Sequence, residues 1–219
     1  MTTTSGPVIM PMFPLGTVLL PTAVLPLQVF EPRYREMVQH CLAADRRFGV
    51  VLIARGHEVG GHDLRTDIGT VAEMLQATEM ANGLWFLVAV GARRLRVRRW
   101  LQDDPYPRAE VEEWDDDPGV AQMDSLSYAS LVGLARQVLA LAAELEHDAN
   151  SAALDVVEDP AVGTFQLAAA LPLGPFDRQQ ILAANGSQAR GELLTQLCQD
   201  RAGDLEGLLR MRPQDNPPF

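Results

Sequence analysis

Apolar and polar residues alternate with two different periods along the chain, and the change of period divides it. In the first half, short apolar or alternating runs indicate strands, whose side chains point to opposite faces in turn. From Pro32 to Leu42, apolar residues instead recur three and four positions apart, so we expect a helix there. About six strands and one helix predict a small, strongly bent mixed sheet or barrel. The extended segments are residues 8–13, 17–20, 23–30, 48–54, 68–76, 84–90, 93–101 and 109–114.

The second half of the chain has a helical period throughout. The run WDDDPG at residues 114–119 marks the boundary through its charges and its turn-forming residues. We therefore expect an α+β protein with a β-rich subdomain at residues 1–118 and a helical subdomain at residues 119–219. The predicted helices lie at residues 131–145, 160–171, 177–184 and 187–209.

Composition excludes several classes of enzyme. All 18 basic residues are arginine, because the 219 residues include no lysine. A P-loop needs a lysine to reach the terminal phosphates, and Ser–Lys dyads and Schiff-base enzymes need an amine, so these classes are excluded. The net charge of −11 is uneven, at +3 for residues 1–100 and −14 for residues 101–219. The acidic second half argues against a general affinity for nucleic acid or anionic membranes.

The N-terminal run and the cysteines bear on cellular location. No basic residue precedes the first apolar run, and repeated prolines there would break a spanning helix. We therefore expect neither a signal peptide nor a membrane span. Cys41 and Cys198 each lie among apolar residues at helical spacing, which is typical of small core residues. Because no spacing indicates a disulfide framework or a zinc site, a reducing cytoplasm is the expected compartment.

Other patterns that suggest chemistry are weak. The sequence HEVGGH at residues 57–62 is one residue longer than a zinc-binding H-E-x-x-H, and its glycines oppose a helix. A polar hairpin tip is the expected structure there. No G-x-S-x-G nucleophile elbow occurs. Asp115, Asp116 and Asp117 are typical of a solvated linker, so we expect no catalytic residue, no metal and no cofactor.

An arginine-rich strand begins near residue 93. The period of two places Arg94, Arg96 and Arg98 on one face, about 7 Å apart, with Leu95 and Val97 on the other. Such a ridge suits the carboxylates of a peptide, the phosphates of RNA or the acidic half of the chain itself.

Apolar residues of the N-terminal run offer a second candidate surface. Methionines near prolines suit an adaptable binding groove, although ordinary core packing explains the same pattern. The seam between the two subdomains would then combine these residues with the arginine ridge. The candidate binding residues are Met10, Met12, Leu19, Leu20, Arg94, Arg96, Arg98 and Trp100.

Several motifs resemble one known family. The run FPLGTVLLPTAVLPLQVFEPRYREMV at residues 13–38 resembles the opening of the N-terminal, substrate-binding domain of Lon protease. The segments DRRFGVVLIARG, IGTVAEML, LVAVGARRLRV and DDPYPRAEVEEW follow in the same order. FQLAAALPLGPFDRQQILAA is similar to the helical segment of the family, so the resemblance extends over residues 8–210.

The resemblance implies a PUA-like pseudo-barrel followed by a helical bundle. It also implies that the signature Phe30, Glu31, Pro32, Arg33 and Tyr34 is structural and joins the first helix to the barrel. In full-length Lon this domain precedes an ATPase and a Ser–Lys protease. We expect neither in 219 residues without lysine, and so expect a stand-alone Lon N-terminal domain protein.

Together these observations predict a binding protein without catalytic activity. The expected partners are unfolded or client polypeptides, with an adaptor or regulator role beside a separate protease. RNA binding through Arg94, Arg96 and Arg98 is the alternative, since PUA-like barrels in other families bind RNA. The acidity of the chain and its 6% aromatic content disfavour it. A hydrolase is the third and weakest hypothesis.

Overall fold

The chain folds into two compact units. The computed structural model describes residues 6–55, 64–146 and 154–211. The first unit, here the β unit, comprises Met1–Pro118 and Leu173–Ala184, and the second, the helical unit, comprises Gly119–Pro172 and Asn185–Phe219. The division after Pro118 coincides with the expected boundary. The assignment of Leu173–Ala184 to the helical subdomain is wrong, because this segment packs against strands of the β unit.

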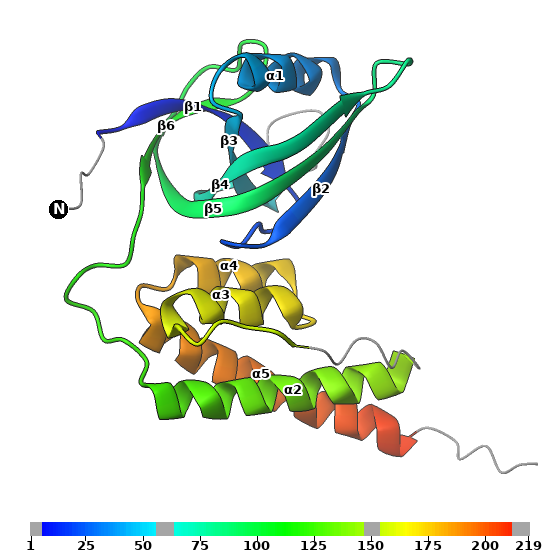
Figure 1. Ribbon diagram of the computed structural model, residues 1–219, viewed down its shortest axis with the longest axis vertical. Helices are drawn as coiled ribbons and strands as arrows, with labels where there is room; N and C mark the ends of the chain where they lie inside the picture. The colour runs from blue at the N-terminus through cyan, green and yellow to red at the C-terminus, as the bar shows by residue number, and fades with distance from the viewer. Residues whose placement is uncertain (1–5, 56–63, 147–153, 212–219) are drawn as a thin grey trace, which may run out of the picture. The chain divides into compact units, whose positions relative to one another are not determined.

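The described part of the β unit contains a six-stranded mixed sheet with the order β2-β5-β4-β3-β1-β6. An additional pairing of β5 with β6 closes the curled part of the sheet. Figure 1 shows β4 and β5 bending across the unit, with the helix α1 (Pro32–Ala43) on one side. The pairing of β1 with β3 is parallel, and the other pairings are antiparallel. The strands are β1 (Val8–Leu15), β2 (Val24–Val29), β3 (Arg47–Arg55), β4 (Leu64–Glu79), β5 (Trp85–Trp100) and β6 (Arg108–Glu113).

The strand β5 is longer than the sequence predicted. The two strands expected at residues 84–90 and 93–101 form one strand, and residues 17–20 lie outside the strands. The first part of β5 pairs with β2 and the last part pairs with β6. Gly91 lies between the two parts, where a Cβ atom would collide with the carbonyl oxygen of Leu20. A close backbone approach of this kind requires glycine, so Gly91 allows the strand to change partners.

Two apolar cores lie on the two faces of the curled sheet. The face under α1 carries the α1 core, which includes Phe13, Met37 and Phe48. The other face carries the curl core, to which β1 contributes Met12. Successive residues of β1 therefore enter different cores, as the alternation of a strand requires. The curl core consists of Met12, Val51, Val71, Leu95, Val97, Ala109 and Val111, with Met10 and Trp100 packed against it.

The helical unit is built from α2 (Ser125–Glu146), α3 (Pro160–Ala170) and α5 (Ser187–Met211). The helix α4 (Pro175–Ala183) belongs to the β unit. Both α2 and α3 pack against α5, and the Asp159 side chain accepts a hydrogen bond from Ala161 N that caps α3. The stretch Ser125–Leu145 of α2 has the length and apolar composition of a membrane span, a test that core helices also pass.

Candidate functional site

The arginine run does not form an open ridge. Arg94 is only 4% exposed. Its guanidinium donates to the backbone oxygens of Leu182 at 3.0 Å and Ala184 at 2.8 Å, at the C-terminal end of α4, and pairs with Asp116. The expectation that Arg94 is available to a ligand is therefore wrong, because a segment some ninety residues away covers it.

The other arginines of β5 contact acidic or aromatic residues of the same unit. Arg98 pairs with Glu112 of β6 at 2.6 Å, and the Arg96 guanidinium lies 4.4 Å from the centre of the Trp114 ring. The exposed Arg93 and Arg99 also pair with glutamates of the strand β6. Acidic residues after position 100 thus pair with four of the five arginines of β5, which argues against a free phosphate-binding surface.

Most of the apolar candidates lie in the cores. Met12, Leu19 and Leu20 are buried, so the prediction that they form a binding groove is wrong. Close packing of both sheet faces leaves them no exposure to a ligand. Met10 is half-buried and lines a pocket, whereas Trp100 packs against the curl core beneath the guanidinium of Arg65.

The family signature has mainly internal contacts. The Glu31 carboxylate accepts a hydrogen bond from Arg33 Nε at 3.0 Å, and Pro32 occupies the first turn of α1. The Tyr34 ring is buried edge-on against Phe13, with ring centres 4.2 Å apart. These contacts fix the start of α1 on the sheet. Phe30 differs, because 63% of it is exposed.

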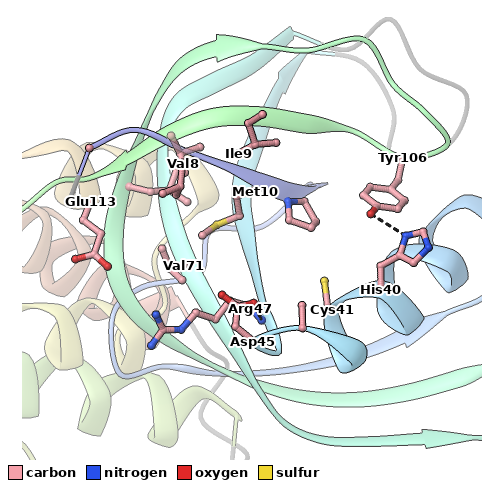
Figure 2. A pocket seen from close by; sticks show the side chains of 15 residues that line it. Val8, Ile9, Met10, His40, Cys41, Asp45, Arg47, Val71, Tyr106 and Glu113 are labelled. Carbon is pink, nitrogen blue, oxygen red and sulfur yellow. Dashed lines mark hydrogen bonds between the residues drawn. The ribbon is translucent and has the colours of Figure 1, made fainter.

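A pocket of about 510 Å³ opens between the first half of β1 and the C-terminal end of α1. Figure 2 shows Val8, Ile9 and Met10 on one side, with Asp45 and Arg47 facing them across the opening. The pocket forms because the pairing of β1 with β3 begins only at Met12. The two strands separate before that residue and leave a gap.

The polar groups of this pocket suit binding rather than covalent chemistry. His40 Nδ1 and the Tyr106 hydroxyl are hydrogen-bonded at 2.9 Å (Figure 2). Burial, helped by the negative charge of Asp45, raises the pKa of the Cys41 thiol to about 12. Burial also raises the pKa of Tyr106. At neutral pH Cys41 is a protonated thiol and therefore a poor nucleophile, in keeping with its expected role as a small core residue.

Metal binding finds no support in the described part of the chain. No group of three or more histidine, cysteine, aspartate or glutamate side chains is placed there to hold an ion. His57 and His62 lie outside the described residues.

A second surface is the outer face of the ribbon formed by β2 and the first part of β5. Leu25 and Leu27 of β2 and Leu87 and Ala89 of β5 pack in the α1 core. The alternate residues Val24, its partner Val90 and Phe86 therefore lie on the opposite side of the ribbon. Val24 is 64% exposed and Phe86 39%. We call this surface the outer apolar face; its apolar residues are Val24, Pro26, Phe86, Val88 and Val90, and the polar Gln28 lies beside Phe86.

The sequence contains a signal for this face. The run LWFLVAV at residues 84–90 is apolar at every position, whereas a half-exposed strand alternates. A strand that is apolar at every position is normally covered on both of its faces. These residues lie in an antiparallel ribbon with only one face on the α1 core, so their other apolar face points outward.

The free edge of β2 does not favour addition of a further strand. Among the described residues β2 pairs with β5 alone. Gly91 N donates a hydrogen bond to Ala23 O at 2.9 Å, so the backbone groups of Ala23 point towards β5. Hydrogen-bonded and non-bonded pairs alternate along an antiparallel ladder. The backbone N–H and C=O groups of Val24, Pro26 and Gln28, where present, therefore point to the free edge. Pro26 lacks an N–H, so the centre of this edge offers no donor.

Comparison with known proteins identifies the family. A family model of the ATP-dependent protease La (LON) substrate-binding domain matches residues 9–200. A Lon protease of Anaeromyxobacter dehalogenans is 30% identical over 198 residues, which cover 87% of this chain and 23% of the relative. Lon protease 2 of Myxococcus xanthus shows the same identity and coverage. The chain thus spans about a quarter of the length of these relatives.

Solved structures agree with the fold. The crystal structure of a Lon N-terminal domain protein from Xanthomonas campestris superposes with a TM-score of 0.61 at 27% identity, covering 94% of this chain and 99% of that one. The N-terminal domain of a Mycobacterium avium complex Lon protease gives a TM-score of 0.60 at 20% identity, covering 88% and 99%. With its mixed α+β fold and a match that covers most of its length, the chain belongs to the Lon substrate-binding domain family.

Proposed function

We propose that this protein recognises exposed apolar segments of unfolded polypeptides and that the outer apolar face is the contact surface. One observation carries the proposal: an antiparallel ribbon presents apolar side chains outward, where polar residues normally lie. Contiguous exposed apolar surface on a folded unit is typical of interaction sites.

The backbone of the ribbon favours loose sequence selectivity. Because Pro26 interrupts the free edge of β2, a client is held mainly through side-chain contacts rather than through a continuous backbone ladder. Apolar contacts have no fixed donor–acceptor pattern, so many client sequences are tolerated. Selection then rests on exposure of apolar residues, a property that distinguishes unfolded chains from folded ones.

The relatives support this role. The family is described as a substrate-binding domain, and the curated relatives are named Lon protease. By analogy this chain serves as an adaptor or regulator of a separate protease in the cytoplasm, with polypeptides as clients and no chemistry of its own. We also propose that the curled sheet is PUA-like and that the helices form a bundle.

Binding to a permanently unfolded protein tests the proposal. We would titrate fluorescein-labelled, reduced and carboxymethylated α-lactalbumin with the protein and follow fluorescence anisotropy, with native α-lactalbumin as the folded comparison. Binding of the unfolded form at tens of micromolar or below is expected. Phe86→Glu should weaken it at least about tenfold, because burial of a phenylalanine stabilises by roughly 1.5–3 kcal/mol.

Leu126→Glu is the matched control. Leu126 is an exposed apolar residue of the helical unit, so its replacement removes a similar side chain from another surface. Binding should not change in this variant. No binding to the unfolded form, or equal losses in the two variants, would contradict the proposal.

A further inference from the structure

The end of the β1–β3 ladder leaves backbone groups of β1 facing the pocket. If the pairing of the two strands continued beyond Met12, Arg47 N would donate a hydrogen bond to the carbonyl oxygen of Ile9. Arg47 N donates to Asp45 Oδ1 at 3.2 Å instead. Arg46 has a φ of 62°, so the chain enters β3 from a turn rather than as an extended strand. No part of β3 therefore continues the ladder beside Ile9.

The hydrogen bonds to β6 identify which groups face this gap. Met12 N donates to Pro107 O at 2.8 Å, and Met10 pairs with Ala109 in the same antiparallel ladder. Hydrogen-bonded and non-bonded pairs alternate in such a ladder, so Ile9 directs both its N–H and its C=O away from β6 and towards the pocket.

The pocket extends to both faces of the sheet. Val71 and Leu95 of the curl core line one side, and His40 of α1 and Tyr106 of the α1 core line the other. A ligand lying in the plane of the sheet would meet both walls. An extended peptide has this geometry, because its main chain lies in the plane and its side chains alternate above and below it.

We infer that this pocket binds a short extended segment of a polypeptide, whose main chain pairs with Ile9 as an added strand. Alternate side chains of the segment enter the apolar wall beside Met10 and the more polar wall beside His40. The inference rests on the proposed function, since it assumes polypeptide clients, but it assigns them a second site that reads backbone as well as side chains.

The flanking residues limit the length of the added strand. Pro7 and Pro11 lie two positions on either side of Ile9 and have no N–H, so Ile9 supplies the central donor of this edge. Only a few residues of a client can therefore pair here. A short, proline-flanked edge also protects the protein from pairing with further copies of itself.

A labelled pentapeptide tests the inference directly. The probe is fluorescein-labelled Thr-Val-Thr-Val-Thr, whose valines suit the apolar wall and whose threonines suit the polar wall. We would compare it with three peptides that are N-methylated singly at the second, third or fourth residue. Pairing with Ile9 uses the N–H of one of these residues, so one methylation should weaken binding about tenfold and the other two less than about twofold. Equal losses for all three peptides, or no loss, would overturn the inference.

Matched variants of the protein locate the site. Ala44 is exposed and lines the pocket, whereas the neighbouring exposed Ala43 does not. Ala44→Trp should fill the opening and weaken pentapeptide binding at least about tenfold, while Ala43→Trp should leave it unchanged. Similar effects of the two replacements would refute the assignment, provided that circular dichroism shows both variants folded.

The two sites fail separately. Phe86→Glu should weaken binding of unfolded α-lactalbumin and leave pentapeptide binding unchanged. If Phe86→Glu abolishes pentapeptide binding and Ala44→Trp does not, the peptide binds the outer apolar face, so the inference fails while the proposed function stands. If unfolded α-lactalbumin does not bind at all but the pentapeptide binds the pocket, the proposed function fails and the pocket assignment stands.

Discussion

Replacement of Arg94 by alanine should destabilise the β unit strongly. The guanidinium holds two backbone oxygens at the C-terminal end of α4, pairs with Asp116 and lies 4.2 Å from the centre of the Trp114 ring. Alanine would leave all of these groups without this partner. Because Arg94 is almost fully buried, water cannot easily replace it.

The magnitude follows from the contacts. Removing one partner of a buried ion pair costs about 3–5 kcal/mol, and a hydrogen bond to a charged group contributes about 1.5–3 kcal/mol. Asp116 keeps some exposure to water, which reduces the cost of leaving it unpaired. We therefore expect the free energy of unfolding to fall by about 3 kcal/mol.

Urea unfolding followed by tryptophan fluorescence measures this change. All three tryptophans, Trp85, Trp100 and Trp114, belong to the β unit, so their emission reports that unit and not the helical one. The control is Arg93→Ala, because the pair of Arg93 with Glu113 is exposed. Exposed pairs contribute about 0–1 kcal/mol. If Arg94→Ala lowers stability no more than Arg93→Ala does, the contact with α4 does not hold the β unit together.

Three further predictions concern other buried positions. Gly91→Ala should lower the urea midpoint of the tryptophan transition, because the new methyl group would collide with the carbonyl of Leu20; an unchanged midpoint would contradict the close approach. The fully buried Arg190 donates hydrogen bonds to Thr164 Oγ1 and Ala161 O. Arg190→Met should therefore lower the free energy of unfolding of the helical unit by about 2–4 kcal/mol, measured by circular dichroism. A loss below about 1 kcal/mol would argue against this contact. Burial raises the pKa of Cys41 to about 12 and that of Cys198 to about 11. Both thiols should therefore react with a disulfide reagent at pH 8 only after unfolding. Fast labelling of the native protein would refute their burial. Since folding raises these pKa values above 9.0, their contribution to stability is complete below pH 9 and is lost as the pH rises towards 11 and 12.

Local features were predictable from the sequence where a short segment suffices to define them. The helical period after Pro32 marks α1, which spans Pro32–Ala43. The dipeptide Asn82-Gly83 is typical of a tight hairpin turn, and Gly83 has a φ of 78° between the antiparallel β4 and β5. These features depend on neighbours a few residues away, so the pattern of residue types determines them.

The candidate site was predicted less well because exposure depends on distant segments. Met12 and Leu20 have the residue types of a binding groove, but both are buried, and Met12 packs among residues of β3, β4 and β5. The pocket beside Met10 depends on where the β1–β3 ladder ends, and that point is set by the turn at Arg46 and by the Asp45 side chain. No periodicity in the sequence records where a pairing between distant strands stops.

The sequence by itself determined the family and the alternation of arginine and apolar residues along the arginine strand. It also excluded the classes of enzyme that need a lysine. Only the tertiary structure decided that α4 covers Arg94 and that Phe86 faces outward. The physical reason is the range of the interactions. Alternation along a strand follows from backbone geometry within a few residues, whereas burial follows from contacts between segments as far apart as β5 and α4.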